Sequence, residues 1–225
     1  MKDAAIPATV VVVFLLIGTA MVPRGESKAA PTPSGWINIM PGPSLDHWTR
    51  VAIPPRDPLN KYSQWSADAA THTIVCAGDG GHEWLRYDSH QFGDFLFHVE
   101  WRLTPHKSGK GYNSGVFVRN NRDASIWYQA QVGSAGGGYW FGYDDPAVKG
   151  PISFNLKSRM TVSPVKPAGQ WNSFDIRCQG AKLSLKVNGT TASEFDACKN
   201  LKGYLGLEAE GSRIEFRRMR VKILK

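Results

Sequence analysis

Apolar and polar side chains alternate along several short segments, and this alternation constrains the fold more than any other feature of the sequence. In the segment 95–103 every second residue is apolar, with His98, Glu100 and Arg102 between them. A repeat of two residues is the repeat of a β-strand with one buried face. The alternation recurs in 183–187, 205–209 and 214–223, and no helical repeat is sustained. These patterns predict an all-β chain.

Turn signals between these segments predict how the strands pair. Asn188 and Gly189 follow the segment 183–187, and both tolerate the positive φ of a tight hairpin. Asn188 also opens an Asn-Gly-Thr sequon, which is the alternative reason for its presence. The apolar parity changes after Phe216, which predicts a β-bulge near Arg217 and Arg218. Short strands separated by glycine-rich turns favour a two-sheet antiparallel sandwich. We expect it to form one domain over 36–225.

An apolar run near the N-terminus separates the first residues from this domain. The run covers 8–20 and follows Lys2, but a membrane-spanning helix needs about 20 apolar residues. Its length is therefore typical of a secretory signal. Cleavage is expected after Ala20 or near Ala29, and the second site gives a signal peptide over 1–29 and a proline-containing linker over 30–35. The alternative is a retained anchor. We expect a secreted or periplasmic protein without a stable membrane span.

Composition and charge exclude several classes of protein. Hydrophobic residues make up 42% and aromatic residues 11% of the 225, which is enough to build a core and excludes a disordered chain. The formal net charge is +8, and basic residues gather near the C-terminus. Acidic residues interrupt this basic segment, and with secretion expected we predict no nucleic-acid partner. We interpret the basic segment as a charged sheet edge that prevents strand-to-strand aggregation. Adhesion to an acidic envelope surface is the alternative. The oligomeric state stays open.

Three cysteines are too few for a disulfide scaffold in a chain of this length. Cys178 has the same parity as Phe174 and Ile176, so its side chain is expected to face the core. In an oxidising compartment it would pair with Cys198 and leave Cys76 free, although three pairings are possible.

Several motifs, in order, carry a resemblance to a known family. They are GDF at 93–95, NSGVFVR at 113–119, YQAQ at 128–131, GQWN at 169–172, VNG at 187–189 and GYLGL at 203–207. The chain from about Trp36 to Lys225 resembles the 3-keto-disaccharide hydrolase family. The resemblance implies a concanavalin A-like jelly-roll sandwich. It also implies a secreted or periplasmic protein with a carbohydrate partner, a glycoside already oxidised at C3 of the sugar.

The chemistry of such a substrate specifies what a site must contain. A ketone at C3 acidifies the hydrogen on C2, so a base can remove it. The resulting enolate expels the glycosidic oxygen from C1, and water can add later. The site needs a general base, a stabiliser for the enolate oxygen and an acid for the leaving group. A hydrogen-bond donor, an arginine or a metal ion can be the stabiliser. A sugar also requires aromatic surface and a few directed polar groups.

Two predicted strands carry side chains of these kinds on one face. Strand periodicity puts Trp127, Gln129 and Gln131 on the same side of 127–132. In 204–210 it puts Tyr204 with Glu208 and Glu210, opposite the apolar residues. If both strands belong to the concave sheet, they form one polar wall suited to a sugar. The alternative is an ordinary solvated sheet face.

The chain departs from the family pattern in both of these strand segments. Where the family reads Tyr-Glu-x-Gln, this chain reads YQAQ at 128–131, with Gln129 in place of the glutamate. Where the family reads Gly-Leu-Gln-Asp-His-Gly, this chain reads GLEAEG at 206–211. We hypothesise that the acid–base groups have moved to Glu208 and Glu210. Mutual repulsion between them would raise the pKa of one. The alternative is a lectin-like carbohydrate-binding protein without catalysis.

Other candidates come from turns and loops. Gly80 and Gly81 predict a turn that presents His82 as an acid, base or ligand, with a locally bonded turn histidine as the alternative. Asn113 and Arg119 belong to a family motif. Arg119 would bind the substrate carbonyl or orient a carboxylate, or else form a structural ion pair.

The loop 134–145 is rich in glycine and aromatic residues, and we expect it to close over a sugar through Trp140, with packing on the sandwich edge as the alternative. His98 and Glu100 have the spacing of metal ligands, but the sequence offers no third ligand. No cofactor is expected, and a divalent metal such as calcium at Asp144 and Asp145 is the alternative.

Overall fold

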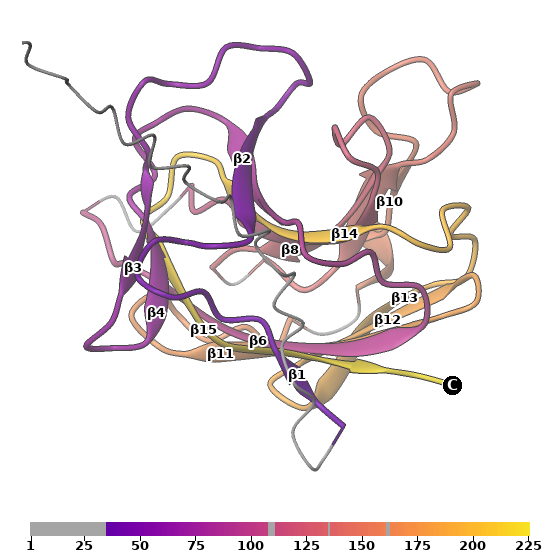
Figure 1. The fold of residues 1–225 in the computed structure, drawn as a ribbon. Helices are drawn as coiled ribbons and strands as arrows, with labels where there is room; N and C mark the ends of the chain where they lie inside the picture. Colours follow the sequence, from indigo (N-terminus) through magenta and orange to yellow (C-terminus); the bar gives the residue numbers. More distant parts are fainter. Residues whose placement is uncertain (1–34, 108–110, 135, 161–162) are drawn as a thin grey trace, which may run out of the picture.

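Two antiparallel β-sheets packed face to face make up the computed structural model of the chain (Figure 1). The structure describes residues 35–225 except 108–110, 135 and 161–162. The predicted signal peptide and nearly all of the linker lie outside the described residues. The all-β, jelly-roll sandwich of the concanavalin A-like type is confirmed. In the part of the chain that the structure describes, no helix is long and apolar enough to cross a membrane.

The first sheet has the order β13-β12-β11-β6-β15-β4-β3, and β1 also pairs with β15. Its strands are β1 (Ile37–Asn38), β3 (Trp65–Asp68), β4 (Thr73–Cys76), β6 (Phe95–Leu103), β11 (Asn172–Gln179), β12 (Lys182–Val187), β13 (Thr190–Phe195) and β15 (Ile214–Ile223). We call it sheet A.

The second sheet, sheet B, has the order β10-β9-β8-β7-β14-β5-β2. Its strands are β2 (Trp48–Ala52), β5 (Glu83–Tyr87), β7 (Ser114–Asn120), β8 (Trp127–Val132), β9 (Trp140–Tyr143), β10 (Phe154–Asn155) and β14 (Tyr204–Ala209). A short 3₁₀ turn, η1 (Lys157–Arg159), follows β10. The edge strands β2 and β10 lie on either side of β14 (Figure 1).

The predicted alternation builds the core between the sheets. Along β6, buried and half-buried residues alternate without interruption. Phe97 pairs with Ile176 of β11 on one side and Val221 of β15 on the other, and all three are buried. Burial of large apolar side chains in this layer is the main driving force for folding.

Both turn predictions are confirmed. Asn188 and Gly189 connect β12 to β13 with φ of 51° and 84°, the conformation that a tight hairpin needs. The register between β15 and β6 shifts between Arg217 and Arg220, and Arg218 has φ of 54°. This bulge lets Phe216 and Met219 both face the core in spite of their odd spacing.

The predicted Cys178–Cys198 disulfide is wrong, because all three cysteines are free and buried. The Cys198 thiol donates to the carbonyl oxygen of Asn200 at 3.3 Å and accepts from Arg119 at 3.7 Å. Burial raises the pKa of Cys178 and of Cys198, so both stay protonated at neutral pH. Shared parity put Cys178 in the core correctly but could not show which atoms face its thiol.

Two glycines shape the outer face of sheet B. A Cβ at Gly115 would lie 2.3 Å from the amide nitrogen of Gln129. A Cβ at Gly206 would lie 2.2 Å from the Trp84 ring. Atoms cannot approach so closely, so a side chain at either position would displace the amide or the ring. The amide and the ring can therefore lie flat over β7 and β14, beside the residues described next.

Candidate functional site

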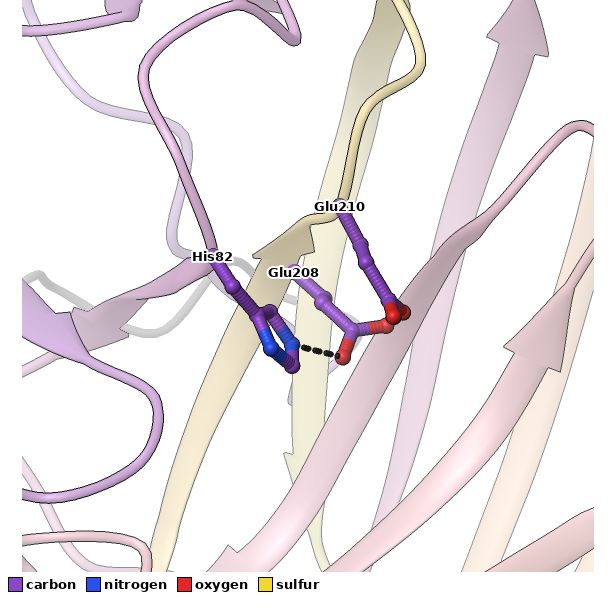
Figure 2. Close-up of side chains that lie close together, drawn as sticks. All are labelled: His82, Glu208 and Glu210. Carbon is purple, nitrogen blue, oxygen red and sulfur yellow. Dashed lines mark hydrogen bonds and ion pairs between the residues drawn. The ribbon is translucent and has the colours of Figure 1, made fainter.

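Three chemically active side chains meet at one end of sheet B (Figure 2). They are His82, in the turn before β5, Glu208 on β14, and Glu210 immediately after β14. One ligand atom from each lies within 4.8 Å of the others, and the described residues contain no other such group of three. His82 Nε2 and Glu208 Oε1 are 3.0 Å apart. We call these three residues the His82 cluster.

Local hydrogen bonds fix the turn that carries His82. The side chain of Gln64 accepts from the amide of Gly80 and donates to the carbonyl of Gly81, both at 3.0 Å. The carbonyl of His82 accepts from the amide of Ile53 at 3.1 Å. Because the turn backbone is held on both sides, the imidazole is directed at β14.

A row of amides continues from the cluster across the sheet. Gln129 Nε2 donates to Glu208 Oε2 at 2.6 Å and to Gln131 Oε1 at 3.3 Å. Gln131 Nε2 donates to Asn113 Oδ1 at 2.8 Å. The structure therefore brings together the acids and amides that strand periodicity had placed on one wall. Their catalytic roles remain a prediction.

Burial and charge shift the proton affinity of the cluster upward. Burial raises the pKa of Glu208, which is 3% exposed, and the charge of Glu210 adds to this effect against hydrogen bonds from His82 and Gln129. Burial lowers the pKa of His82, but the hydrogen bond and charge of Glu208 and the charge of Glu210 outweigh it, so the net shift is upward. Both shifts favour a proton held between imidazole and carboxylate.

Aromatic rings lie beside the cluster on the same face of the sheet. Trp84 pairs with Glu208 across β5 and β14, and Phe117 pairs with Gln129 across β7 and β8. Trp127 is half-buried, with its ring centroid 6.2 Å from that of Phe117 and 5.1 Å from that of Phe141. Sequence reasoning found Trp127 and placed Phe141 in the predicted closing loop, but it missed Trp84 and Phe117. Strand parity could have found Trp84 and Phe117, since each lies two residues from a position already singled out.

Tyr204 lies on this face but away from the cluster. Four residues of strand separate it from Glu208, which is about 13 Å at the usual rise per residue. Its hydroxyl accepts from Gln91 at 3.0 Å, and its ring lies 5.2 Å from the Arg86 guanidinium carbon. Tyr204 therefore borders the aromatic surface and does not contact the acids.

Arg119 and Trp140 are not brought to the site. A register shift between β7 and β14, with φ of 52° at Arg119, turns this side chain off the outer face. Arg119 is fully buried, donates to the carbonyls of Gly93 and Gly180, and pairs with Asp94 at 3.0 Å. It therefore forms the structural ion pair that was the alternative to substrate binding. Trp140 is fully buried in the core, because 140–143 forms β9 of sheet B and not a closing loop.

The other two metal hypotheses fall on residues with partners of their own. Asp144 accepts from the Tyr128 hydroxyl at 3.0 Å, and Asp145 pairs with Lys199 at 2.8 Å. Glu100 accepts hydrogen bonds from Arg217 and Arg218 on the outer face of sheet A. A cavity of about 870 Å³ opens there, lined by His98, Glu100 and several basic residues of β15, and it is separate from the His82 cluster.

Known structures share this fold at low sequence identity. The carbohydrate-binding module CBM66 from Bacillus subtilis is 15% identical, with 78% of this chain and 95% of that chain covered and a TM-score of 0.58. A glycosyl-hydrolase candidate from Parabacteroides distasonis is also 15% identical, with 85% and 95% covered and a TM-score of 0.58. An alginate lyase is 11% identical, with 80% and 96% covered and a TM-score of 0.54.

Comparison with curated proteins gives no match. A family model does match, and it covers residues 35–222, which is nearly all of the described chain. Its description is a 3-keto-alpha-glucoside-1,2-lyase-like domain. The protein is therefore one that processes or binds carbohydrate. The chain belongs to the family of 3-keto-alpha-glucoside-1,2-lyase-like domains.

Proposed function

We propose that the protein cleaves glycosidic bonds of 3-keto-glycosides by abstraction of the C2 proton, followed by elimination or hydrolysis. The observation that carries this proposal is the buried Glu208 carboxylate, bonded to His82 and Gln129 and adjacent to Glu210. A base with a raised pKa is suited to removing a carbon-bound proton near neutral pH. Family membership supports the choice of substrate class.

Each group of the cluster has a role in this reaction. Glu208 accepts the C2 proton, and the hydrogen bond from Gln129 fixes the direction of its carboxylate. The positive charge on His82 stabilises the oxygen of the enolate. The electron pair of the C–H bond moves to the enolate and then expels the glycosidic oxygen from C1. Glu210, the more exposed acid, returns a proton to that oxygen.

The departures from the family pattern are compatible with catalysis. The family has a carboxylate at position 129 and an amide at 208, whereas this chain has the reverse. The structure joins these two side chains by a 2.6 Å hydrogen bond across β7. The exchange therefore keeps a bonded carboxylate–amide pair and moves its charge to β14, next to His82. This supports relocation of the base over its loss.

The decisive test is turnover of a chromogenic 3-keto-glucoside by the full chain. We expect turnover by the wild type and its loss in Glu208→Gln. Glu210→Gln is the second variant, because this side chain is partly exposed whereas Glu208 is buried. His98→Ala, on the other sheet, is the control. Unchanged turnover in both glutamate variants would overturn the assignment.

A lectin-like function is the second candidate, and the half-buried Trp127 on the outer face of sheet B favours it. Aromatic rings supply much of the binding energy of sugar sites. If the wild type turns over no 3-keto-glucoside but binds a sugar, and Trp127→Ala loses that binding, the protein is a carbohydrate-binding module. Fold alone does not distinguish the two.

The proposal places the protein outside the cytoplasm, in the secreted or periplasmic fraction. It rests on the short apolar run over 8–20 and on the expected cleavage near Ala29. Mass spectrometry of the protein from its native host would give the mature N-terminus. Finding Met1 in the mature protein would contradict cleavage.

A further inference from the structure

The His82 cluster contains two carboxylates and only one group that can carry a positive charge, the imidazole of His82. Among the described residues, the only ion pair made by Glu208 or Glu210 is the one between Glu208 and His82. Glu208 is 3% exposed, so water screens its charge poorly. Two carboxylates that face one imidazole in such surroundings form a site that attracts a cation.

The geometry of the cluster is close to that of a metal site. His82 Nε2 and Glu208 Oε1 are 3.0 Å apart, and two ligands of one zinc ion are about 3.3 Å apart at the tetrahedral angle. The third ligand atom, from Glu210, lies within 4.8 Å of both. Glu210 is only half-buried and can close this distance by rotation of its side chain. Figure 2 shows its carboxylate directed at that of Glu208.

A second layer of contacts leaves the ligand atoms available. Gln129 donates to Oε2 of Glu208, so Oε1 is the atom left for an ion. Hydrogen bonds of this kind orient ligands in metal sites. Gln64 and Ile53 hold the backbone on either side of His82. Three protein ligands leave at least one coordination position for a substrate oxygen.

The donor set selects the class of ion. Calcium and magnesium prefer oxygen ligands alone, whereas an imidazole nitrogen suits first-row transition ions. We propose that His82, Glu208 and Glu210 bind one first-row divalent cation, such as zinc or manganese, through Nε2 and one oxygen of each carboxylate.

Such an ion would also take part in the proposed reaction, and this role of the ion rests on the proposed function. The open position would take the C3 oxygen of the sugar, where negative charge develops when the C2 proton leaves. The cation would then supply the charge that protonated His82 supplies without it. The oxygen of Glu208 that is not bound to the ion remains to accept the proton.

Calorimetric titration of the full chain, treated with a chelator and then freed of it, tests the site without sugar. We expect zinc or manganese to bind with one ion per chain, and calcium to bind at least ten-fold more weakly. Glu210→Gln is expected to weaken binding at least ten-fold. His98→Ala is the matched control, since it removes the histidine of a second histidine–carboxylate group and is expected to change nothing.

The inference is overturned if neither zinc nor manganese binds the wild type, or if Glu210→Gln binds them as tightly as the wild type does. Turnover measured in parallel separates this result from the proposed function. Turnover without metal binding would reject the metal site alone. Metal binding without turnover of any 3-keto-glucoside would reject the proposed reaction alone.

Discussion

Two histidines of the described chain each lie next to two carboxylates, His82 on sheet B and His98 on sheet A, and the two groups differ in what neutralises the carboxylates. On sheet B, His82 is the only partner with which Glu208 forms an ion pair in the described chain. On sheet A, His98 bonds to Asp175 at 2.6 Å, and Glu100 pairs with Arg217 and Arg218 at 2.7 and 2.9 Å. We call the latter the His98 cluster.

This difference in partners reverses the shift in the glutamate pKa. Burial raises the pKa of Glu100, but the hydrogen bonds of the two arginines outweigh it and the net shift is downward. The pKa of Glu208 is shifted upward. A carboxylate held by guanidinium groups is a structural charge, whereas one left next to another acid can exchange a proton or bind a cation. Residue types alone do not separate the two cases.

Replacing the glutamate of each cluster should affect catalysis very differently. Glu208→Gln should lower kcat on a 3-keto-glucoside by about a thousand-fold, since general acid–base groups contribute about 10²–10⁴-fold. Glu100→Gln, the matched change in the His98 cluster, should leave kcat unchanged. Steady-state kinetics on both variants checks this. Equal losses in the two variants would mean that the clusters do not differ in function.

The second prediction concerns Gly115, whose lack of a side chain leaves space for the Gln129 amide. Gly115→Ala puts a methyl group where the Gln129 amide now lies, so the hydrogen bond to Glu208 should be lost. We expect a loss of about 1–3 kcal/mol in the free energy of unfolding, as for other overpacked sites, together with lower kcat. Denaturant unfolding measures the first quantity. Gly42→Ala is the control, because its nearest contact would be 3.9 Å away; an equal loss there would exclude a specific clash.

Two tryptophans extend the comparison to sugar binding. Trp127 on sheet B and Trp171, which directly precedes β11 of sheet A, are both half-buried, but the guanidinium groups of Arg102 and Arg217 lie over the Trp171 ring at 4.7 and 3.8 Å. Trp127→Ala should weaken sugar affinity about ten-fold, which is about 1.4 kcal/mol. Trp171→Ala should leave it unchanged. Titration of an unreactive glucoside analogue measures both affinities. A larger loss in Trp171→Ala than in Trp127→Ala would place the sugar on sheet A and contradict the site on sheet B.

Replacing Glu208 and replacing Glu100 should change the thermal stability by small amounts of opposite sign. The pKa of Glu208 is raised in the folded state. Its favourable contribution to the free energy of unfolding is therefore present at low pH and is lost as the pH rises through the folded-state pKa. Glu208→Gln should therefore raise Tm at neutral pH. The folded-state pKa of Glu100 is lowered from its usual 4.5, so its contribution exists above that value and is lost at lower pH. Glu100→Gln should lower Tm at neutral pH, and the difference should shrink below pH 4.5.

Each change in this last pair is expected to be on the order of 1 kcal/mol, or about 2–4 °C in Tm. Thermal unfolding followed across pH gives both differences. Shifts of the same sign at neutral pH would show that burial and ion pairing do not separate the two clusters as described.

Much of the site followed from strand periodicity. The alternation in 127–132 and 204–210 was enough to put Gln129, Gln131 and Glu208 on one face, because successive side chains of a strand point to opposite sides. It failed at Arg119, where a bulge turns the chain by one residue and sends the guanidinium into the interior. It failed for Trp140 because glycine-rich composition suggested a loop where the chain forms β9.

The all-β sandwich, the Asn188–Gly189 hairpin and the bulge in β15 could be predicted without coordinates, since strand alternation and turn residues depend on neighbours along the chain. The contact of His82 with Glu208, 126 residues away, and that of Glu100 with two arginines became visible only in the folded chain. The fold also leaves Cys178 and Cys198 as free thiols. Strand periodicity fixes the face on which a side chain lies, but its partners come from strands distant in sequence. Partners and burial set the charge of a group, and with it the chemistry available to the protein.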